Sequence, residues 1–252
     1  MKVVVIIQAR MGSTRLPGKV LMPLMGKPSI QHVIERAKLI PDISKVVIAT
    51  SKLPKDDRLV EFCESIDVSV FRGSENDVLN RYYEAAIFYK ADVVVWITGD
   101  CPLIDPIESG IVVKKLLNGG ADYVSNVLHP KLPDGLDTEA FTIVTLKKTW
   151  KCATKKADRE HVSLYIHSNP KKFKIESVSY DVDYGIYRLT LDEMADYELL
   201  KKVFDILEKN NQFGYLNELV SILKKNPDLM SINSNYKRNE GLDTSLREDS
   251  SN

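Results

Sequence analysis

Residues 3–19, VVVIIQARMGSTRLPGK, join a run of five apolar residues to a loop rich in cations. The run Val3–Ile7 is typical of a strand buried on both faces of a parallel sheet. The loop after it carries Arg10, Arg15 and Lys19 among glycine and proline residues. Ligands bind beyond the carboxyl ends of the strands in open α/β sheets. The stretch therefore predicts both a parallel sheet and an anion site at its edge.

Apolar runs of the same kind recur at 46–49 and 93–97. Between them the apolar residues follow a helical period, at 30–37 and again at 78–86. Strand, helix, strand and helix in this order form right-handed crossovers. The sequence thus predicts a three-layer α/β domain with a mostly parallel central sheet.

The second half of the chain is less regular. Helical patterns lie near 106–118, 158–168, 194–210 and 215–225, and strand-like stretches near 121–127, 138–144, 173–179 and 186–191. We expect a single domain over 1–232, in which about 128–185 forms a small subdomain inserted beside the main sheet. Residues 233–252 are polar and predict a mobile or loosely docked tail.

Composition limits the possible partners. Lys plus Arg and Asp plus Glu each number 35 in 252 residues, so there is no broad basic field for nucleic acid or anionic membranes. The first apolar run is too short for a secretory signal or a membrane span. Cys63, Cys101 and Cys152 form an odd set without a C-x-x-C pair, which favours buried thiols over disulfides or zinc. We expect a cytoplasmic protein.

The opening loop matches neither common nucleotide-binding pattern. It lacks G-x-G-x-x-G, and Lys19 precedes Val20 where a phosphate-binding loop needs Ser or Thr. The alternative is that its three cations are solvated surface charges. Pro17 and Gly18 interrupt any helix there, so no helical pairing offsets the repulsion between the cations. A bound polyanion would relieve that repulsion.

Residues 6–37, IIQARMGSTRLPGKVLMPLMGKPSIQHVIERA, resemble the opening of the nucleoside-monophospho-sugar synthetases. These comprise the acylneuraminate and 3-deoxy-manno-octulosonate cytidylyltransferases, and the resemblance is strongest to their spore-coat-polysaccharide branch. It implies a Rossmann-like, GT-A-like nucleotidyltransferase fold in which this segment binds CTP. The residues it assigns to the nucleotide are Ala9, Arg10, Gly12, Ser13, Arg15 and Lys19.

Two aspartates follow strand-like stretches. Asp100 lies in VVVWITGDCPLIDP (93–106) and Asp192 in RLTLD (188–192). Locally, either could cap a turn or a helix. The resemblance implies that both bind a catalytic Mg²⁺ and that Asp100 also contacts the nucleotide, while Arg15 and Lys19 offset charge on the departing pyrophosphate. Two carboxylates and substrate phosphates are sufficient ligands for magnesium.

Three further stretches share the resemblance. FRGSENDVLNRYYEAA (71–86) places Arg72, Gly73 and Asp77 near the base or ribose, although Asp77 equally suits the first turn of a helix. LPDGLDTEAF (132–141) and DREHVSLYIH (158–167) resemble the segments that build the acceptor side and the contact between subunits of a homodimer. The acceptor candidates are Gly135, Asp137, Glu139, Arg159, Glu160 and His161. An ordinary D-G turn and a solvated helix face remain alternatives.

The functional hypothesis is therefore a magnesium-dependent cytidylyltransferase. It would transfer CMP from CTP to a small sugar acceptor, such as a sugar acid, for surface polysaccharide synthesis. One alternative is a glycosyltransferase whose metal-binding acids are Asp181 and Asp183 in a D-x-D triplet. Another is a nucleotide-binding protein without catalysis. The tail motif NYKRNEG (235–241) also resembles the spore-coat branch, and the sequence assigns it no role.

Overall fold

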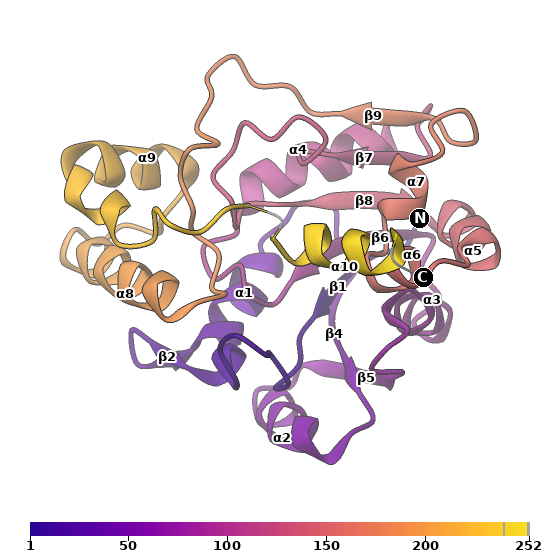
Figure 1. Ribbon diagram of the computed structural model, residues 1–252, viewed down its shortest axis with the longest axis horizontal. Helices are drawn as coiled ribbons and strands as arrows, with labels where there is room; N and C mark the ends of the chain where they lie inside the picture. Colours follow the sequence, from indigo (N-terminus) through magenta and orange to yellow (C-terminus); the bar gives the residue numbers. More distant parts are fainter. Residues whose placement is uncertain (239, 251–252) are drawn as a thin grey trace.

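The computed structural model describes residues 1–238 and 240–250 (Figure 1). In chain order its elements are β1 (Val3–Gln8), η1 (Lys19–Leu21), β2 (Pro23–Leu24), β3 (Lys27–Pro28), α1 (Ser29–Ala37), β4 (Lys45–Ser51), η2 (Pro54–Asp56), α2 (Asp57–Ser65), β5 (Ser69–Gly73), α3 (Val78–Phe88), β6 (Val93–Thr98), α4 (Pro106–Leu117), β7 (Tyr123–Ser125), β8 (Glu139–Thr142), α5 (Ile143–Cys152), α6 (Lys156–Glu160), α7 (Leu164–His167), β9 (Ile175–Ser177), α8 (Met194–Lys209), α9 (Leu216–Lys225), η3 (Pro227–Ser231) and α10 (Glu240–Ser250).

The main sheet has seven strands in the order β5-β4-β1-β6-β8-β7-β9. Strands β5, β4, β1 and β6 are mutually parallel, and β8 runs antiparallel to both of its neighbours. The three apolar runs of the sequence form the centres of β1, β4 and β6. The predicted α/β fold with a mostly parallel sheet is confirmed.

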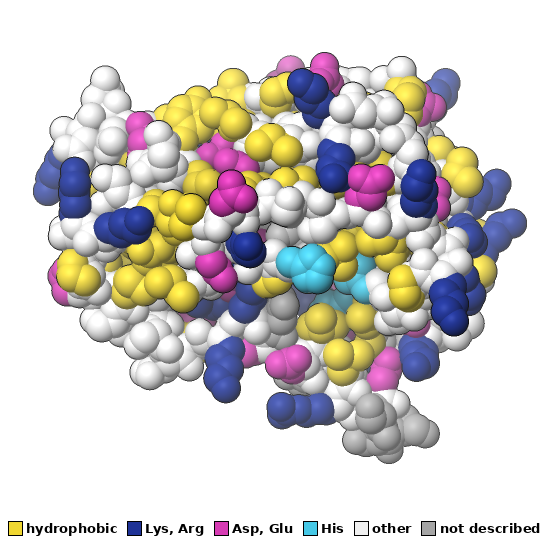
Figure 2. Space-filling view, turned by 90° about the horizontal axis from the view of Figure 1, so that it is seen from above, with side chains coloured by type: hydrophobic (Ala, Val, Ile, Leu, Met, Phe, Trp, Pro, Cys, Tyr) yellow, Lys and Arg dark blue, Asp and Glu magenta, His cyan; other side chains and the backbone are white. Residues whose placement is uncertain are grey.

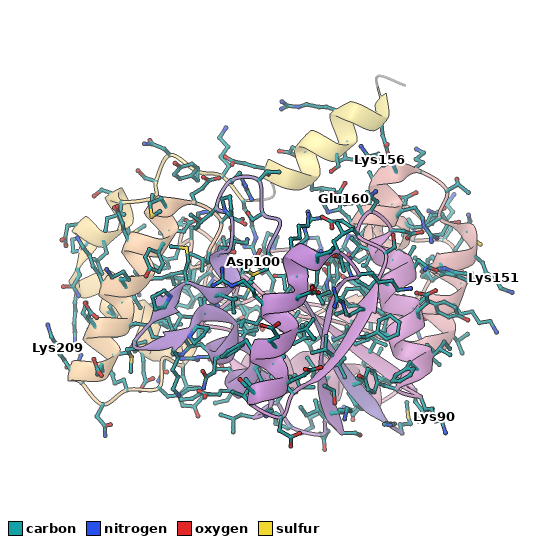
Figure 3. All side chains as sticks on the ribbon, turned by 90° about the horizontal axis from the view of Figure 1, so that it is seen from below. Lys90, Asp100, Lys151, Lys156, Glu160 and Lys209 are labelled. Atoms are coloured by element: carbon teal, nitrogen blue, oxygen red, sulfur yellow. The ribbon has the colours of Figure 1, made fainter. Side chains whose placement is uncertain are left out.

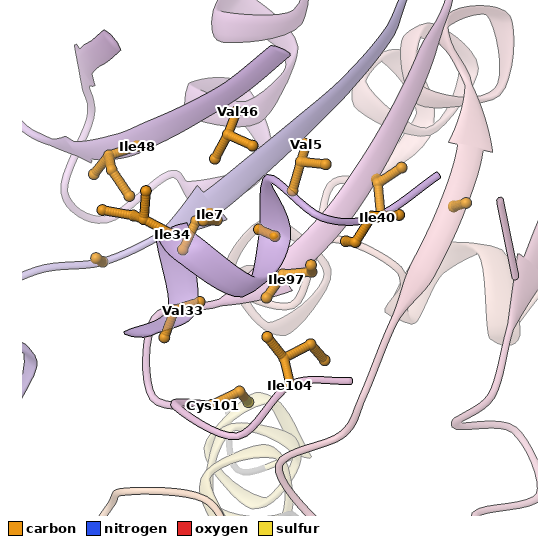
Figure 4. Packing of buried hydrophobic residues seen from close by; sticks show 14 of the residues in the cluster. Val5, Ile7, Val33, Ile34, Ile40, Val46, Ile48, Ile97, Cys101 and Ile104 are labelled. Atoms are coloured by element: carbon orange, nitrogen blue, oxygen red, sulfur yellow. The ribbon is translucent and has the colours of Figure 1, made fainter. Parts of the chain in front are cut away.

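Alternate residues of β1 face opposite layers of helices. Val5 and Ile7 belong to an apolar cluster that includes Ile34 of α1, together with residues of α2 and α4 (Figure 4). Ile6 faces the other layer, where it packs in a cluster with Tyr82 of α3 and residues of α5 and α7. A third cluster gathers around α8 and α9, which lie at one end of the sheet in Figure 1. The three layers follow from the period-two alternation of the strands.

Three expectations for the second half differ from the structure. The region at about 128–185 does not stand beside the main sheet, because β8 and β9 are strands of it. The helical pattern at 158–168 is divided into α6 and α7, with His161 in an extended conformation between them. The strand expected at 186–191 is wrong: there the described chain forms one isolated bridge, between Asp134 and Arg188.

The polar tail is docked rather than loose. Helix α10 packs against α6 and crosses one face of the molecule (Figures 1 and 3). The carboxylate of Asp249 accepts a hydrogen bond of 2.9 Å from the backbone N–H of Ala157, at the start of α6. Polar contacts, which leave no apolar pattern in the sequence, hold this helix in place.

The surface agrees with the balanced composition. On the face seen in Figure 2, cationic and acidic side chains are interspersed. Among the helices of the described chain, none is long and apolar enough to cross a bilayer. Cys63 and Cys101 are buried as expected, but Cys152 is exposed, so the expectation of three buried thiols is wrong for that residue.

Candidate active site

Three segments distant in the sequence meet at the carboxyl edge of the sheet. The ammonium group of Lys19 lies 2.9 Å from Asp100 Oδ2 and 2.7 Å from Asp192 Oδ1. Arg15 Nη2 lies 3.0 Å from the same oxygen of Asp192. The four residues that the sequence places in the catalytic group therefore surround one point, with Lys19 between the two carboxylates.

Close backbone packing brings Asp100 to the opening loop. Gly99 donates a hydrogen bond of 2.7 Å to the carbonyl of Gln8. A Cβ atom at Gly99 would lie 2.8 Å from the side chain of Ala9 and 2.9 Å from that carbonyl, so only glycine fits. Gly18, with a φ of 74°, turns the loop back into η1 and so directs Lys19 at the acids. The predicted nucleotide residue Ala9 is thus a packing contact beneath the site.

Asp192 is held by a neighbour and not by the capping role considered from sequence. The carboxylate of Asp196 accepts hydrogen bonds of 3.0 Å from the backbone N–H groups of Asp192 and Glu193. Arg188 forms an ion pair of 2.9 Å with Asp196 and lies 3.5 Å from Asp192. Because Glu193 and Asp196 form a capping box at the start of α8, the Asp192 side chain can turn toward Lys19.

Lys19 and Asp100 hold each other in their charged forms. Burial opposes the charged form of Lys19, but Asp100 and Asp192 outweigh it and hold the pKa of Lys19 above its ordinary value. Burial likewise acts to raise the pKa of Asp100, and the Lys19 ammonium overcomes this and lowers it. Two carboxylate oxygens that converge on one cation form a site with the charge that a divalent metal needs. Within the described residues, no group of three or more His, Cys, Asp or Glu side chains is arranged as a complete metal site.

Arg10 of the opening loop belongs to a second group of charged side chains. Arg10 lies 3.7 Å from the carboxylate of Glu75, which also pairs with Lys55 at 2.6 Å. Lys55 Nζ would be 2.5 Å from a Cβ on Gly12, so glycine there lets the ammonium approach the loop backbone. The hydroxyl of Ser13 accepts a hydrogen bond of 3.2 Å from the backbone of the loop itself. Arg10 of the loop and Lys55 of η2 are thus joined through the carboxylate of Glu75.

The residues predicted near the base have structural partners. Arg72 donates to the carbonyls of Ser51 and Leu53, both at 3.0 Å. A Cβ on Gly73 would lie 2.8 Å from the side chain of Arg81, which explains the glycine. For Asp77 the alternative reading is confirmed: its side chain caps α3 by accepting from the N–H of Asn80 at 2.9 Å.

The predicted acceptor residues do not share one site. Gly135 has a φ of 101°, and a Cβ atom added to it would lie 2.7 Å from the backbone nitrogen of Thr190. This close packing joins the 132–138 loop to the segment that carries Asp192. Asp137 lies close enough to Asp100 for that charge to raise its pKa, although burial is the larger cause. Arg159 instead pairs with Asp77 at 2.6 Å and joins α6 to α3.

Glu160, the last residue of α6, and His161, which follows it, face the tail. His161 Nε2 lies 3.1 Å from the hydroxyl of Ser245, which also donates to Glu160 at 3.2 Å. Figure 3 labels Glu160 and Asp100 on the side of the molecule that carries α10. These contacts place Glu160 and His161 beneath α10 and not around the Lys19 cluster.

Glu139 occupies a separate buried cluster. Its carboxylate accepts a hydrogen bond from the hydroxyl of Tyr123, and that hydroxyl lies 2.8 Å from His167 Nε2. Burial raises the pKa of Glu139 to about 7. Burial also lowers the pKa of His167 to about 4, so its 3.7 Å contact with Glu139 is not an ion pair at neutral pH. The cluster therefore contains a buried carboxyl group, that of Glu139, which titrates near neutrality.

Glu139→Gln is expected to stabilise the protein more at pH 8 than at pH 5. The folded protein ionises Glu139 near pH 7, whereas an unfolded glutamate ionises near 4.5. Wild-type stability is therefore lost as the pH rises between these values, by about 3 kcal/mol at 1.36 kcal/mol per pKa unit. Urea unfolding at both pH values measures the difference, with Glu208→Gln on the exposed face of α8 as the control. If the difference in unfolding free energy between Glu139→Gln and the wild type does not change with pH, Glu139 does not titrate near neutrality in the folded protein.

Comparison with known proteins agrees with this arrangement. The cytidylyltransferase family profile matches residues 4–235. The chain belongs to the cytidylyltransferase family. It is 33% identical over 229 residues to the spore coat polysaccharide biosynthesis protein SpsF of Bacillus subtilis, covering 88% of this chain and 94% of that protein.

Two proteins named as cytidylyltransferases are also similar. A solved cytidylyltransferase structure from Leptospira borgpetersenii superposes with a TM-score of 0.86 at 36% identity, covering 94% of this chain and 99% of that one. The 3-deoxy-manno-octulosonate cytidylyltransferase of Geobacter metallireducens is 38% identical over 174 residues, which is 68% of this chain and 62% of that protein. The predicted nucleotidyltransferase fold is confirmed.

The glycosyltransferase alternative finds no support in the structure. Asp181 and Asp183 are exposed in the loop after β9. The carboxylate of Asp183 accepts a hydrogen bond of 2.8 Å from the N–H of Gly185, as in an ordinary turn. The D-x-D triplet is a turn on the surface.

Sequence reasoning missed four charged residues of the candidate site. Arg188 lies within the quoted RLTLD motif, so the motif itself was a signal. Lys55, Asp134 and Arg238 lie in loops without a periodic pattern. Only their position next to the carboxyl ends of strands, or the tail motif, could have suggested them.

Proposed function

We propose that this protein transfers CMP from CTP to a sugar acid and releases pyrophosphate. The observation that carries the proposal is the convergence of Lys19 with Asp100 and Asp192, beside the opening loop at the carboxyl edge. The name of the Geobacter relative supplies the class of acceptor, an eight-carbon sugar acid. The name of the Bacillus relative suggests a role in polysaccharide synthesis.

In this proposal Arg15 and Lys19 bind the triphosphate. A guanidinium group suits phosphate oxygens because its N–H donors can contact two of them at once, and an ammonium group acts as a point charge. Arg10 and Lys55 would bind the same polyanion. Glu75 now occupies the position between these two cations, so the nucleotide has to replace its carboxylate.

Asp100 and Asp192 are the residues that would hold Mg²⁺. The point between them already accommodates the positive charge of Lys19, which is the evidence that a cation fits there. A divalent cation held there would repel the Lys19 ammonium, which could then contact the phosphates. When bound, the metal would neutralise phosphate charge and orient the nucleotide.

The reaction then depends mainly on position and charge. An acceptor oxygen attacks the α-phosphorus in line, its hydroxyl proton passes to water as the new O–P bond forms, and the bond between the α-phosphorus and the oxygen that bridges to the β-phosphate breaks. Arg15 and Lys19 stabilise the charge that gathers on the departing pyrophosphate. The proposal also includes a cytoplasmic location and a homodimeric assembly, both of which are expected from the sequence.

CTP with Mg²⁺ is expected to stabilise the protein more than ATP, GTP or UTP does. At about 100 times its dissociation constant, a ligand that binds only the folded state adds about 2.7 kcal/mol to the free energy of unfolding. Thermal unfolding with each triphosphate measures this, and each without Mg²⁺ is the control. If no triphosphate raises the melting temperature, the proposed function is wrong.

A further inference from the structure

The tail segment with the unassigned NYKRNEG motif runs along the proposed active site. Asn233 begins it by donating to the backbone of Arg188 at 3.1 Å and to Asp196 at 2.8 Å. Further on, Glu240 lies 3.6 Å from Arg15. Helix α10 then packs against α6. The tail therefore contacts both sides of the edge at which Lys19, Asp100 and Asp192 meet.

Arg238 is the residue that this segment inserts toward the acceptor side. Its Nη2 donates to the carboxylate of Asp137, and its Nη1 donates to the carbonyl of Leu132 at 3.1 Å. Its Nε lies 3.9 Å from Asp134, whose other oxygen pairs with Arg188 at 2.9 Å. The side chain of Arg238 is 17% exposed, so a ligand at this edge can still reach it.

The carboxylates near Arg238 create an electrostatic problem for an acidic acceptor. Asp134 is buried and Asp137 is half-buried, and the two carboxylates lie close enough to each other and to Asp100 for their charges to interact. A sugar that approaches the phosphorus beside Asp100 passes this acid pair. A carboxylate on that sugar would be repelled unless a cation is present.

We propose that Arg238 is a specificity-determining residue that allows the site to accept a sugar with a carboxylate group. The inference rests on the proposed function and extends it to the acceptor. A guanidinium group has five N–H donors, and the contacts with Leu132 and Asp137 use two of them. Arg238 can therefore neutralise the acid pair and also donate to an incoming carboxylate.

The test compares the full chain with Arg238→Ala, Arg238→Lys and Lys237→Ala. The acceptors are 3-deoxy-manno-octulosonate and its neutral carboxamide, with CTP and Mg²⁺, and the readout is pyrophosphate release. For Arg238→Ala we expect the KM of the acid to rise about tenfold or more, as for a lost hydrogen bond between charged groups. The KM of CTP should stay within about twofold, because it depends on other residues.

The same comparison gives the controls. The preference for the acid over the carboxamide should fall about tenfold in Arg238→Ala and recover in part in Arg238→Lys, which keeps the charge but loses the fork. Lys237→Ala removes an equal charge from an exposed neighbour and should change neither KM. Glu240→Gln weakens another contact of the tail, and the preference for the acid should remain.

Other results would overturn the inference. These are an equal loss with the acid and the carboxamide, a matching rise in the KM of CTP, or the same loss of preference in Glu240→Gln. If the wild-type protein releases no pyrophosphate, the proposed function fails and calorimetric binding of 3-deoxy-manno-octulosonate decides this inference separately. Binding that is lost in Arg238→Ala supports it, and absent or unchanged binding overturns it.

Discussion

Asp100→Asn and Asp192→Asn are each expected to lower pyrophosphate release about a hundredfold or more. Asparagine keeps the shape of the side chain and removes the charge, so the variant loses the attraction for Mg²⁺ and for Lys19. Removing one group that stabilises a transition state typically costs 10²–10³ in turnover, or about 2.7–4 kcal/mol. The measurement is turnover at saturating CTP and Mg²⁺.

The exposed loop offers a matched control for this pair. Asp181→Asn makes the same chemical change on the surface, and its turnover should equal that of the wild type. Thermal unfolding identifies any variant that is merely unfolded. Wild-type turnover in either Asp100→Asn or Asp192→Asn would show that the two carboxylates are not the metal site.

Lys19→Met is expected to lower the free energy of unfolding by about 3 kcal/mol or more in a metal-free buffer. It leaves Asp100 and Asp192 close together without the ammonium that now separates them, and breaking a buried ion pair on one side typically costs 3–5 kcal/mol. Arg15 and Arg188 still compensate part of the charge of Asp192. Most of the loss is therefore assigned to Asp100.

Magnesium gives this prediction a second readout. In the wild type a metal has to displace Lys19, whereas in Lys19→Met it meets two uncompensated carboxylates. Added Mg²⁺ should therefore stabilise the variant more than the wild type in urea unfolding. Lys27→Met is the control, because Lys27 pairs with Glu35 on the surface, where such a pair contributes about 0–1 kcal/mol. Equal stabilisation of Lys19→Met and the wild type by Mg²⁺ would contradict the proposal that Lys19 and Mg²⁺ occupy the same point.

Turnover of Lys19→Met tests the same residue in its second proposed role. If Lys19 moves to the phosphates when the metal binds, its loss should reduce turnover even where Mg²⁺ has restored stability. The two readouts together separate a structural counter-ion from a group that contacts the substrate. A stable, metal-saturated variant with wild-type turnover would leave Lys19 with the structural role alone.

Local patterns determined the first half of the fold. The apolar runs of β1, β4 and β6 and the helical stripes of α1 and α3 are long and strictly periodic, and each reports the burial of its own segment. The same patterns placed the opening loop and Asp100 at the carboxyl edge, since parallel strands bring such loops to one side. Elements such as β5 and α10 have no comparable period: β5 was missed, and α10 was expected to be a loose tail.

Only the tertiary structure decided which charges meet. Lys19 is 173 residues from Asp192, and Arg238 is 101 residues from Asp137, and neither distance leaves a trace in the local sequence. The opposite case is given by Asp77, Arg72 and Arg159. Their residue types suit ligand binding, but each forms an ion pair with a residue of another element. Periodicity records whether a side chain is buried, because burial depends on its own segment. The partner of a charged group depends on how distant segments pack, so the sequence alone did not determine it.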